Sequence, residues 1–196
     1  MHNRRFDPDQ APRLEDPERL KWFPPQQIIE ALRIEPGMAI ADIGAGTGFF
    51  AAPMAEFAGS DGVVYAVDVE KKMLARLREK IELGIAPANI VLVEADAIGT
   101  SLPYASCDRV LVANVWHEIE DGRAALGEFA RILRSDGCLA ILDWSPDATR
   151  PPGPPLDHRV SCEHACATLL RSGWKPISSA PFGPYSYLVI ATPPAS

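Results

Sequence analysis

Residues 41–48 read Ala41-Asp42-Ile43-Gly44-Ala45-Gly46-Thr47-Gly48 and continue an apolar run that begins at Met38. The apolar run predicts a buried strand, and the glycines predict a tight turn that opens a helix. In a parallel α/β sheet such a turn lies at the carboxyl edge, where ligands bind. Gly44 and Gly46 allow the backbone to approach a ligand, and the free N–H groups of the next helix favour an anion or carboxylate. We therefore expect a ligand site at this turn.

The rest of the chain alternates between helix-like and strand-like segments. Helical periodicity is clear in Lys71–Glu82 and in residues 121–133. Strand-like apolar runs occupy residues 38–43, 63–69, 90–95, 109–115 and 138–144. This alternation predicts a parallel sheet that is covered by helices.

The last part of the chain predicts an antiparallel edge for this sheet. After a proline-dense loop at residues 146–155 come a helical segment at 161–171 and strand-like segments at 173–179 and 185–191. A short turn joins the last two strands, so we expect them to pair antiparallel. The expected fold is a Rossmann-like α/β three-layer sandwich with a seven-stranded, mostly parallel sheet.

The composition is that of one globular domain. The chain has 196 residues, enough for a single buried core, and 47% of them are apolar. Residues 1–24 are polar and form an amino-terminal arm, and residues 25–196 form the domain. The net charge of -7, without a basic run, makes nucleic acid an unfavourable partner.

The sequence also gives expectations about membrane insertion, cellular location and the state of the cysteines. It has no apolar stretch long enough to span a bilayer, and its first residues lack the apolar core of a secretion signal. We therefore expect no membrane insertion and a cytoplasmic location. The four cysteines show no disulfide framework and are expected to be free thiols.

Two aspartates follow neighbouring strands at the same edge of the sheet. Asp68 ends the second strand, where a carboxylate can accept hydrogen bonds from ribose hydroxyls. Alternatively, Asp68 caps the helix at Lys71–Glu82. Asp96 follows the third strand and suits an adenine amino group. The glycine spacing is Gly-x-Gly-x-Gly, not the Gly-x-Gly-x-x-Gly of dinucleotide sites, which weakens the case for a nicotinamide cofactor.

These features resemble the class I S-adenosylmethionine-dependent methyltransferases. The resemblance covers roughly residues 25–192 and is carried by Asp42 to Gly48, Asp68, Asp96, residues 110–114 and residues 131–137. The chain is most similar to small-molecule methyltransferases related to quinone-biosynthesis C-methyltransferases, which have counterparts of Asn114-Val115-Trp116-His117-Glu118-Ile119. One departure is Ser135-Asp136-Gly137, where the family usually has Pro-Gly-Gly.

The resemblance implies a strand order of 3-2-1-4-5-7-6 with the last strand antiparallel, and S-adenosylmethionine as the cofactor. The implied reaction is in-line displacement of the methyl group by a small-molecule acceptor, which leaves S-adenosylhomocysteine. The matching residues take the family's roles: Asp42, Gly44, Ala45, Gly46, Thr47 and Gly48 hold the methionine part, Asp68 the ribose, Asp96 with Ala97 the adenine, and Asn114 the amino end.

Candidate residues for the acceptor lie beyond the fourth and fifth strands. His117 and His158 are the candidates for a general base. Trp22, Trp144 and Arg159 are the candidates for binding the acceptor. The plainer alternatives are that His117 is an ordinary loop residue, that Trp144 packs in the core and that Arg159 braces a loop. The arm either covers the site or is a solvated tail.

Two other functions fit the same sequence. An NAD(P)-dependent oxidoreductase shares the strand, turn and helix, and a non-catalytic cofactor-binding protein keeps the fold without turnover. His158, Cys162 and Cys166 follow one another at intervals of four, so a metalloid acceptor is a narrower variant, although no resident metal is expected. We expect a monomer or a homodimer.

Overall fold

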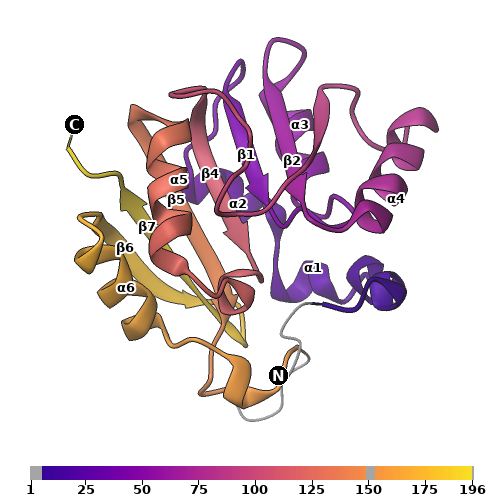
Figure 1. The fold of residues 1–196 in the computed structure, drawn as a ribbon. Helices are drawn as coiled ribbons and strands as arrows, with labels where there is room; N and C mark the ends of the chain where they lie inside the picture. Colours follow the sequence, from indigo (N-terminus) through magenta and orange to yellow (C-terminus); the bar gives the residue numbers. More distant parts are fainter. Residues whose placement is uncertain (1–5, 149–152, 196) are drawn as a thin grey trace.

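The computed structural model describes residues 6–148 and 153–195. Residues 1–5 of the expected arm, residues 149–152 of the proline-dense loop and the last residue lie outside the described part. The described residues form a central sheet with a helical layer on each side (Figure 1).

The sheet has seven strands in the order β3-β2-β1-β4-β5-β7-β6. Strands β1 to β5 are parallel, and β7 pairs antiparallel with both β5 and β6. The expected strand order and the antiparallel edge are therefore confirmed. The strands are β1 (Ala39–Ile43), β2 (Val63–Asp68), β3 (Ile90–Glu94), β4 (Cys107–Ala113), β5 (Leu133–Trp144), β6 (Lys175–Phe182) and β7 (Ser186–Thr192).

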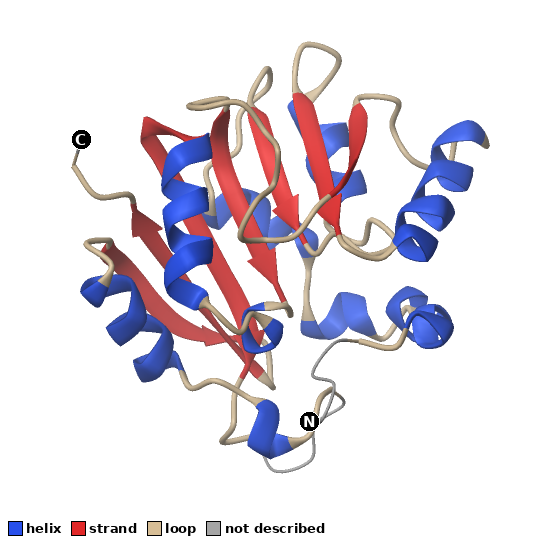
Figure 2. Ribbon diagram, viewed as in Figure 1, coloured by secondary structure: helices blue, strands red, loops and turns tan. Residues whose placement is uncertain are grey.

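Helices cover both faces of the sheet, and each layer buries its own apolar cluster (Figure 2). On one face, α5 and α6 contribute Phe129 and Leu169. On the other face, α2, α3 and α4 contribute Ile28, Met54 and Leu77. Burial of each such side chain stabilises the fold by about 1.5–3 kcal/mol. The helices are α2 (Pro25–Ala31), α3 (Ala51–Ala58), α4 (Lys71–Glu82), α5 (Gly122–Ile132) and α6 (Cys162–Arg171).

Side-chain caps fix where the two helices of the first layer begin. Asp121 accepts a hydrogen bond from the backbone N–H of Ala124 at 2.9 Å, at the start of α5. Ser161 does the same for His164 at 3.2 Å, at the start of α6. These bonds satisfy N–H groups that the first helical turn leaves unpaired.

The start of β5 differs from the sequence prediction. The strand begins at Leu133, directly after α5, whereas a turn at residues 135–137 was expected first. Leu133 pairs with Cys107, the next pair along the two strands is Cys138 with Arg109, and a register irregularity lies between them. The glycine of the expected turn therefore lies within an irregular part of the strand.

The arm is more structured than its sequence predicts. It contains the 3-10 helix η1 (Pro8–Glu15) and the short helix α1 (Arg19–Trp22). Asp7 begins η1, and its side chain accepts a hydrogen bond from the backbone N–H of Asp9 at 3.0 Å. Local capping of this kind gives structure to a segment without apolar periodicity.

Across residues 6–148 and 153–195, no helix combines the length and the apolar character needed to cross a membrane. All four cysteines are free thiols, as the sequence predicts. Burial raises the pKa of the Cys107 and Cys138 thiols, which keeps both in the neutral form near pH 7.

Candidate functional site

A cavity of about 1140 Å³ lies at the carboxyl edge of the sheet. Its walls come from the turn after β1, the ends of β2, β4 and β5, the short helix η2 (Trp116–Glu118), the arm and residues 153–158. In the described part of the chain, the lining does not include Gly48 or Arg159. The predicted site residues that do line the cavity are Trp22, Asp42, Gly44, Ala45, Gly46, Thr47, Asp68, Asp96, Ala97, Asn114, His117, Trp144 and His158.

The turn after β1 has a backbone conformation that favours glycine. Gly44, Gly46 and Gly48 have φ angles of +71°, +56° and +89°. A Cβ atom on Gly44 would lie 2.3 Å from Cγ2 of Val115, so a side chain would not fit there. Helix α3 begins at Ala51 and not directly at the last glycine.

The N–H groups of this turn are largely bonded within the protein, which differs from the expected anion site. Gly44 and Ala45 donate to the carbonyl oxygen of Val67 at 2.8 and 3.0 Å. Gly46 donates to Oδ2 of Asp68 at 2.8 Å. What the turn offers to a ligand is therefore a close backbone surface beside carboxylates, which favours positive charge.

Several buried polar atoms near the turn have no hydrogen-bond partner within the described residues. They are Oδ2 of Asp42 and both amide atoms of Asn114. Buried polar atoms are almost always paired, so these atoms indicate a ligand with complementary groups. Burial, and next the charge of Asp68, raises the pKa of Asp42 to about 7. A cationic group on the ligand would favour the charged form of this carboxyl.

Asp68 connects the end of β2 to the glycine turn. In addition to its bond with Gly46, it accepts a hydrogen bond from the backbone N–H of Glu70 at 2.8 Å. Burial raises the pKa of Asp68, although these backbone bonds oppose the shift. Glu70 is the N-cap residue of α4 and makes no capping hydrogen bond with its own side chain. Asp68 therefore holds both the glycine turn and the residue at which α4 begins.

Asp96 and Ala97 line the cavity beyond the end of β3. Oδ1 of Asp96 accepts a hydrogen bond from the backbone N–H of Ile98 at 3.2 Å. Because the sheet order is β3-β2-β1-β4, the polar groups follow its edge from Asp96 through Asp68 and the glycine turn to Asn114. The arrangement gives an elongated site that crosses four strands.

His117 lies in η2, just after β4, and is 3% exposed. Its Nδ1 is 2.8 Å from Oδ1 of Asp143, at the end of β5, and its backbone N–H donates to Oδ2 of Asp143 at 2.7 Å. Burial lowers the pKa of His117, but the charge of Asp143 and the hydrogen bond to it leave the pKa raised overall. On the other side of the ring, Nε2 lies 3.7 Å from Oε1 of Glu118.

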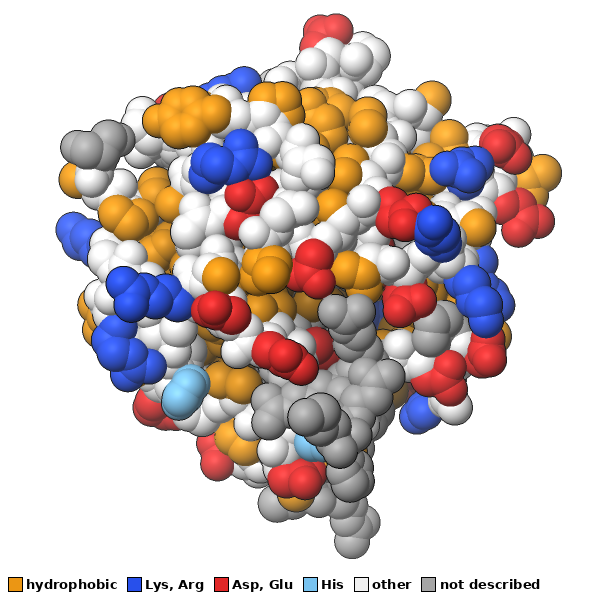
Figure 3. Space-filling view, viewed as in Figure 1, with side chains coloured by type: hydrophobic (Ala, Val, Ile, Leu, Met, Phe, Trp, Pro, Cys, Tyr) orange, Lys and Arg blue, Asp and Glu red, His pale blue; other side chains and the backbone are white. Residues whose placement is uncertain are grey.

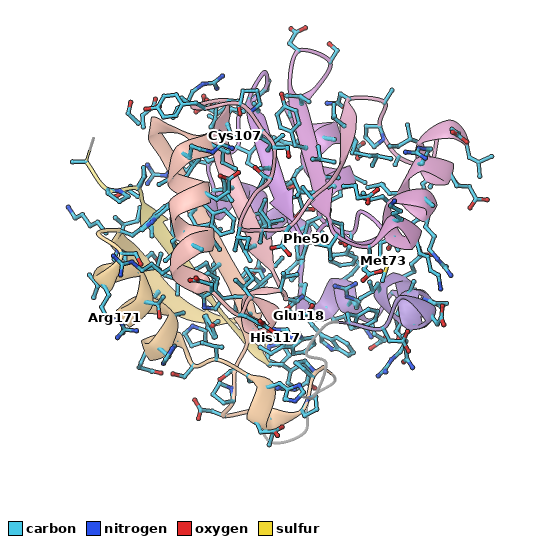
Figure 4. The ribbon with its side chains drawn as sticks, in the orientation of Figure 1. Phe50, Met73, Cys107, His117, Glu118 and Arg171 are labelled. Atoms are coloured by element: carbon cyan, nitrogen blue, oxygen red, sulfur yellow. The ribbon has the colours of Figure 1, made fainter. Side chains whose placement is uncertain are left out.

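Glu118 is a cavity residue to which the sequence assigned no role. Its side chain is 17% exposed, and the backbone of Phe6 in the arm hydrogen-bonds to its carboxyl group. Burial raises the pKa of Glu118 to about 7, against the charge of His117, which lowers it. Figure 4 shows His117 and Glu118 next to each other beyond the strand ends. The available sequence signal was an acid beside a candidate base just past a strand.

The three residues proposed to bind the acceptor do not all line the cavity. Trp22 and Trp144 line the cavity. The guanidinium of Arg159 lies 5.4 Å from the ring centroid of Trp144 and donates to the backbone oxygens of Ser145 and Pro154, both at 2.9 Å. These bonds agree with the alternative that Arg159 braces the loop behind Trp144.

His158, Cys162 and Cys166 do not share a helical face. His158 lines the cavity from the short helix η3 (Leu156–His158), whereas α6 begins at Cys162. Among the described residues, no group of three or more His, Cys, Asp or Glu side chains is arranged to hold a metal ion. Burial, and next the charge of Cys166, raises the pKa of the Cys162 thiol to about 11, which disfavours the thiolate that a metalloid needs.

Ion pairs join the arm to α4 beside the glycine turn. Nζ of Lys80 lies 2.8 Å from Oε1 of Glu15 and also donates to the backbone oxygen of Thr47 at 3.0 Å. Nζ of Lys72 lies 3.1 Å from Oδ1 of Asp9. Charged side chains of both signs lie along this side of the molecule (Figure 3). The arm is thus tied to the same turn that borders the cavity.

A second contact of the arm is the stacking of Arg19 on Phe49. The guanidinium carbon lies 4.3 Å from the ring centroid, and both residues line the cavity. Burial lowers the pKa of Arg19 to about 10, so the side chain stays charged at neutral pH. The sequence did not identify this pair, because the contact joins segments that are far apart along the chain.

Comparisons with known proteins support a methyltransferase fold. A family model described as a methyltransferase domain matches residues 41–141, more than half of the chain. A ubiquinone/menaquinone biosynthesis C-methyltransferase from Shewanella piezotolerans is 31% identical over 117 residues, which cover 60% of this chain and 47% of the relative. The chain spans about half the length of the curated relatives it matches.

Solved structures share the fold over most of the chain. The S-adenosylmethionine-dependent methyltransferase from Aquifex aeolicus has a TM-score of 0.89 at 29% identity, with 95% of this chain and 98% of that chain covered. A type 11 methyltransferase from Sulfolobus solfataricus has a TM-score of 0.71 at 24% identity, with 88% and 93% covered. The second likeness shows the fold alone.

Proposed function

This chain belongs to the methyltransferase-domain family, among the class I S-adenosylmethionine-dependent proteins, and we propose that it transfers a methyl group from S-adenosylmethionine to a small-molecule acceptor. The observation that carries the proposal is the set of buried atoms of Asp42 and Asn114 that have no partner among the described residues, around a turn that favours glycine. The donor has the amino group, hydroxyl groups and positive charge that such atoms and carboxylates would bind.

Each part of the donor has a matching group along the sheet edge. The amino end of the methionine part would be held by Asp42 and Asn114, whose buried polar atoms need partners. The ribose hydroxyls would donate to Asp68, and the adenine would lie beside Asp96 and Ala97. Close approach of the donor to the backbone is possible because the turn has no side chains at its glycines.

When bound, S-adenosylmethionine supplies a methyl group activated by a positively charged sulfur. The residues of the chain then have to orient the acceptor in line with that methyl group and exclude water. Trp22 and Trp144 form apolar walls for the acceptor. The aromatic face of Trp144 would also interact favourably with a cation.

The arm would close the site over the bound donor. The support for this role is its pairing with α4 through Glu15 and Asp9, and the position of Leu14, whose Cδ1 lies 3.5 Å from the place of a Cβ on Gly46. A segment in this position excludes water from the cavity.

The test is calorimetric titration of the purified protein with S-adenosylhomocysteine, repeated on Asp68→Ala and with NADH in place of the first ligand. Micromolar binding that is lost in the variant is the expected result. Methyl transfer from labelled S-adenosylmethionine to candidate acceptors then tests turnover. Binding of NADH in preference to S-adenosylhomocysteine would overturn the proposal in favour of an oxidoreductase. Binding without transfer to any acceptor would favour the non-catalytic alternative.

A further inference from the structure

The two outer strands of the sheet differ in how well their edges are protected. β6 is one edge and contains Pro176 and Pro181, and its pairing with β7 is irregular between Pro176 and Ser178. Prolines and irregular pairing prevent the edge of a sheet from accepting another strand. β3 is the other edge, and its residues 90–94 are four apolar residues and a glutamate that pair with β2 in one continuous register. The β3 edge therefore lacks this protection.

The pairing of β3 with β2 shows which backbone groups of β3 point outward. Just before and just after the strand, Asn89 accepts and Ala95 donates a backbone hydrogen bond to β2, each of 3.1 Å. Along a paired strand, successive residues bond alternately to one side and to the other. The odd-numbered residues of β3 therefore bond to β2. The N–H and C=O groups of Ile90, Leu92 and Glu94 point away from the sheet.

Apolar side chains are exposed along the same edge. Val91 is 45% exposed, and Ile85 and Ile98, before and after the strand, are 70% and 51% exposed. Val91 lies on the sheet face that α5 and α6 cover, but these helices lie mainly over β5, β6 and β7, and the described connection at residues 95–106 contains no helix. Figure 3 shows apolar side chains at the surface on the β2 and β3 side of this face. Exposed apolar surface of this kind marks an interaction site.

We propose that the β3 edge binds a second copy of the chain, with the two β3 strands paired antiparallel around a two-fold axis at Leu92, so that the two sheets become one. The sequence left both a monomer and a homodimer open. The inference goes beyond the proposed function and does not depend on it, because it rests on the edge of the sheet and not on the donor site.

The register of the strand pair follows from the outward backbone groups. Centring the pair on Leu92 places Leu92 opposite itself and Ile90 opposite Glu94 of the second copy, so the outward groups of all three residues find partners. Val91 and Val93 of the two copies then lie opposite each other between these bonds, where side chains are closest. The single charge of the strand, Glu94, does not meet its own copy. Each of these contacts except the central one occurs twice, as a two-fold axis requires.

Helix α4 adds complementary charges beside the strand pair. Lys71, Ala75, Arg78 and Glu82 are exposed and follow one another at helical spacing. Nζ of Lys71 lies 3.3 Å from Oε1 of Glu94, so this stripe of α4 borders the β3 edge. The two-fold axis reverses the direction of α4 in the second copy, which brings the Lys71 end of one stripe to the Glu82 end of the other. Opposite charges therefore meet across the contact.

The exposed isoleucines are complementary in the same way. Continuing the register beyond the strand leads from Ile98 to Ala86 of the second copy, which is next to Ile85. Their burial removes apolar surface of both copies from water. Ile98 also lines the cavity, so the second copy lies beside the end of the site where Asp96 is expected to hold the adenine.

Sedimentation velocity of the full chain over a micromolar concentration series tests the dimer. The wild type should sediment as a dimer, and a wild type that is monomeric throughout the series would overturn the proposal. Leu92→Pro removes an outward N–H and places a proline ring in the strand pair, so it should be monomeric. The bonds of β3 to β2 remain, because the lost N–H points outward.

Leu92→Ala is the matched control for the proline variant. It also loses the leucine side chain but keeps the N–H, so it should remain a dimer with weaker association. Circular dichroism shows whether both variants are folded. Two folded variants that associate equally well would contradict pairing through β3.

A charge exchange on α4 tests the same contact without a change in β3. Glu82→Lys should raise the dissociation constant of the dimer about tenfold, because it replaces two pairs of opposite charges by like charges. Adding Lys71→Glu should restore association to within about twofold of the wild type. Glu163→Lys, an exposed site on α6 at the other end of the sheet, is the control and should associate like the wild type. Failure of the double variant to recover would overturn the arrangement.

Hydrogen exchange measured by NMR identifies the surface that pairs. In the dimer the amides of Ile90, Leu92 and Glu94 should exchange slowly, and in diluted, monomeric Glu82→Lys they should exchange fast. The amides of Val91 and Val93, which bond to β2, should be slow in both states. A wild-type dimer in which Ile90, Leu92 and Glu94 exchange fast would be joined by another surface, and the proposal would be wrong. These readouts need no cofactor, so they are separate from the titration with S-adenosylhomocysteine.

Discussion

Replacement of Gly44 by alanine tests how strictly the turn after β1 is shaped. Gly44 has a φ of +71°, and a Cβ there would lie 2.3 Å from Cγ2 of Val115. The left-handed conformation costs an alanine about 1–2 kcal/mol. Forcing a methyl group into a packed place costs about 1–3 kcal/mol more. Gly44→Ala should therefore lower the free energy of unfolding by about 2–5 kcal/mol.

Urea unfolding followed by circular dichroism measures this loss, provided that the m-values agree. Gly37→Ala is the matched control. Gly37 has a φ of +86°, and no described residue has an atom within 4 Å of the place that its methyl group would take, so only the conformational cost of about 1–2 kcal/mol applies. Adding Val115→Ala to Gly44→Ala removes the obstructing methyl groups and should recover part of the loss. The steric argument would be refuted if Gly44→Ala loses no more stability than Gly37→Ala. It would also be refuted if the losses from Gly44→Ala and Val115→Ala simply add in the double variant.

Three further predictions concern charged groups. Because burial raises the pKa of Asp42 to about 7, the cofactor-free protein should lose stability as pH rises from about 4 to about 7, and Asp42→Asn should flatten this fall in thermal unfolding. Asp143 raises the pKa of His117 by stabilising the charged ring, so this contribution to stability is present below that pKa and is lost above it. Asp143→Asn should therefore lower the free energy of unfolding, measured in urea, by about 3 kcal/mol at low pH and by clearly less above the pKa of His117. Lys80→Met removes the ion pair with Glu15 and should weaken binding of S-adenosylhomocysteine about twofold to fivefold, as measured by calorimetry, because exposed pairs contribute about 0.5–1 kcal/mol. Unchanged affinity would contradict a role for the arm in closing the site.

The sheet and its glycine turn could be predicted because their signals are local. Apolar runs and glycines at fixed spacing depend on residues that are close in the sequence. The start of β5 could not be predicted in the same way. Leu133 joins the strand because it pairs with Cys107 across an irregular register, and that pairing depends on a distant segment.

The cavity residues also divide into those that local sequence signals predict and those that depend on contacts between distant segments. Asp68 ends β2 and Asn114 directly follows β4, so their place at the sheet edge follows from the alternation of strands and helices. The pairing of His117 with Asp143 joins residues 26 apart and depends on how η2 turns after β4. The sequence therefore indicated His117 at the cavity, where it lies, but not that Asp143 pairs with its Nδ1 or that Glu118 lies beside its Nε2. The contact of Arg19 with Phe49 was missed for the same reason, since it depends on how the arm folds back.

The pair of carboxylates at the glycine turn links the stability of the free protein to its choice of ligand. The charge of Asp68 adds to burial in raising the pKa of Asp42, so it disfavours the charged form of Asp42 in the free protein. A cation bound between them reverses this effect, so binding of a positively charged donor should release a proton and stabilise the fold more strongly as pH rises. After methyl transfer the sulfur is neutral, and this part of the attraction is lost. The carboxylates along this edge of the cavity should therefore attract the positively charged donor more strongly than its product, which is the direction that turnover requires.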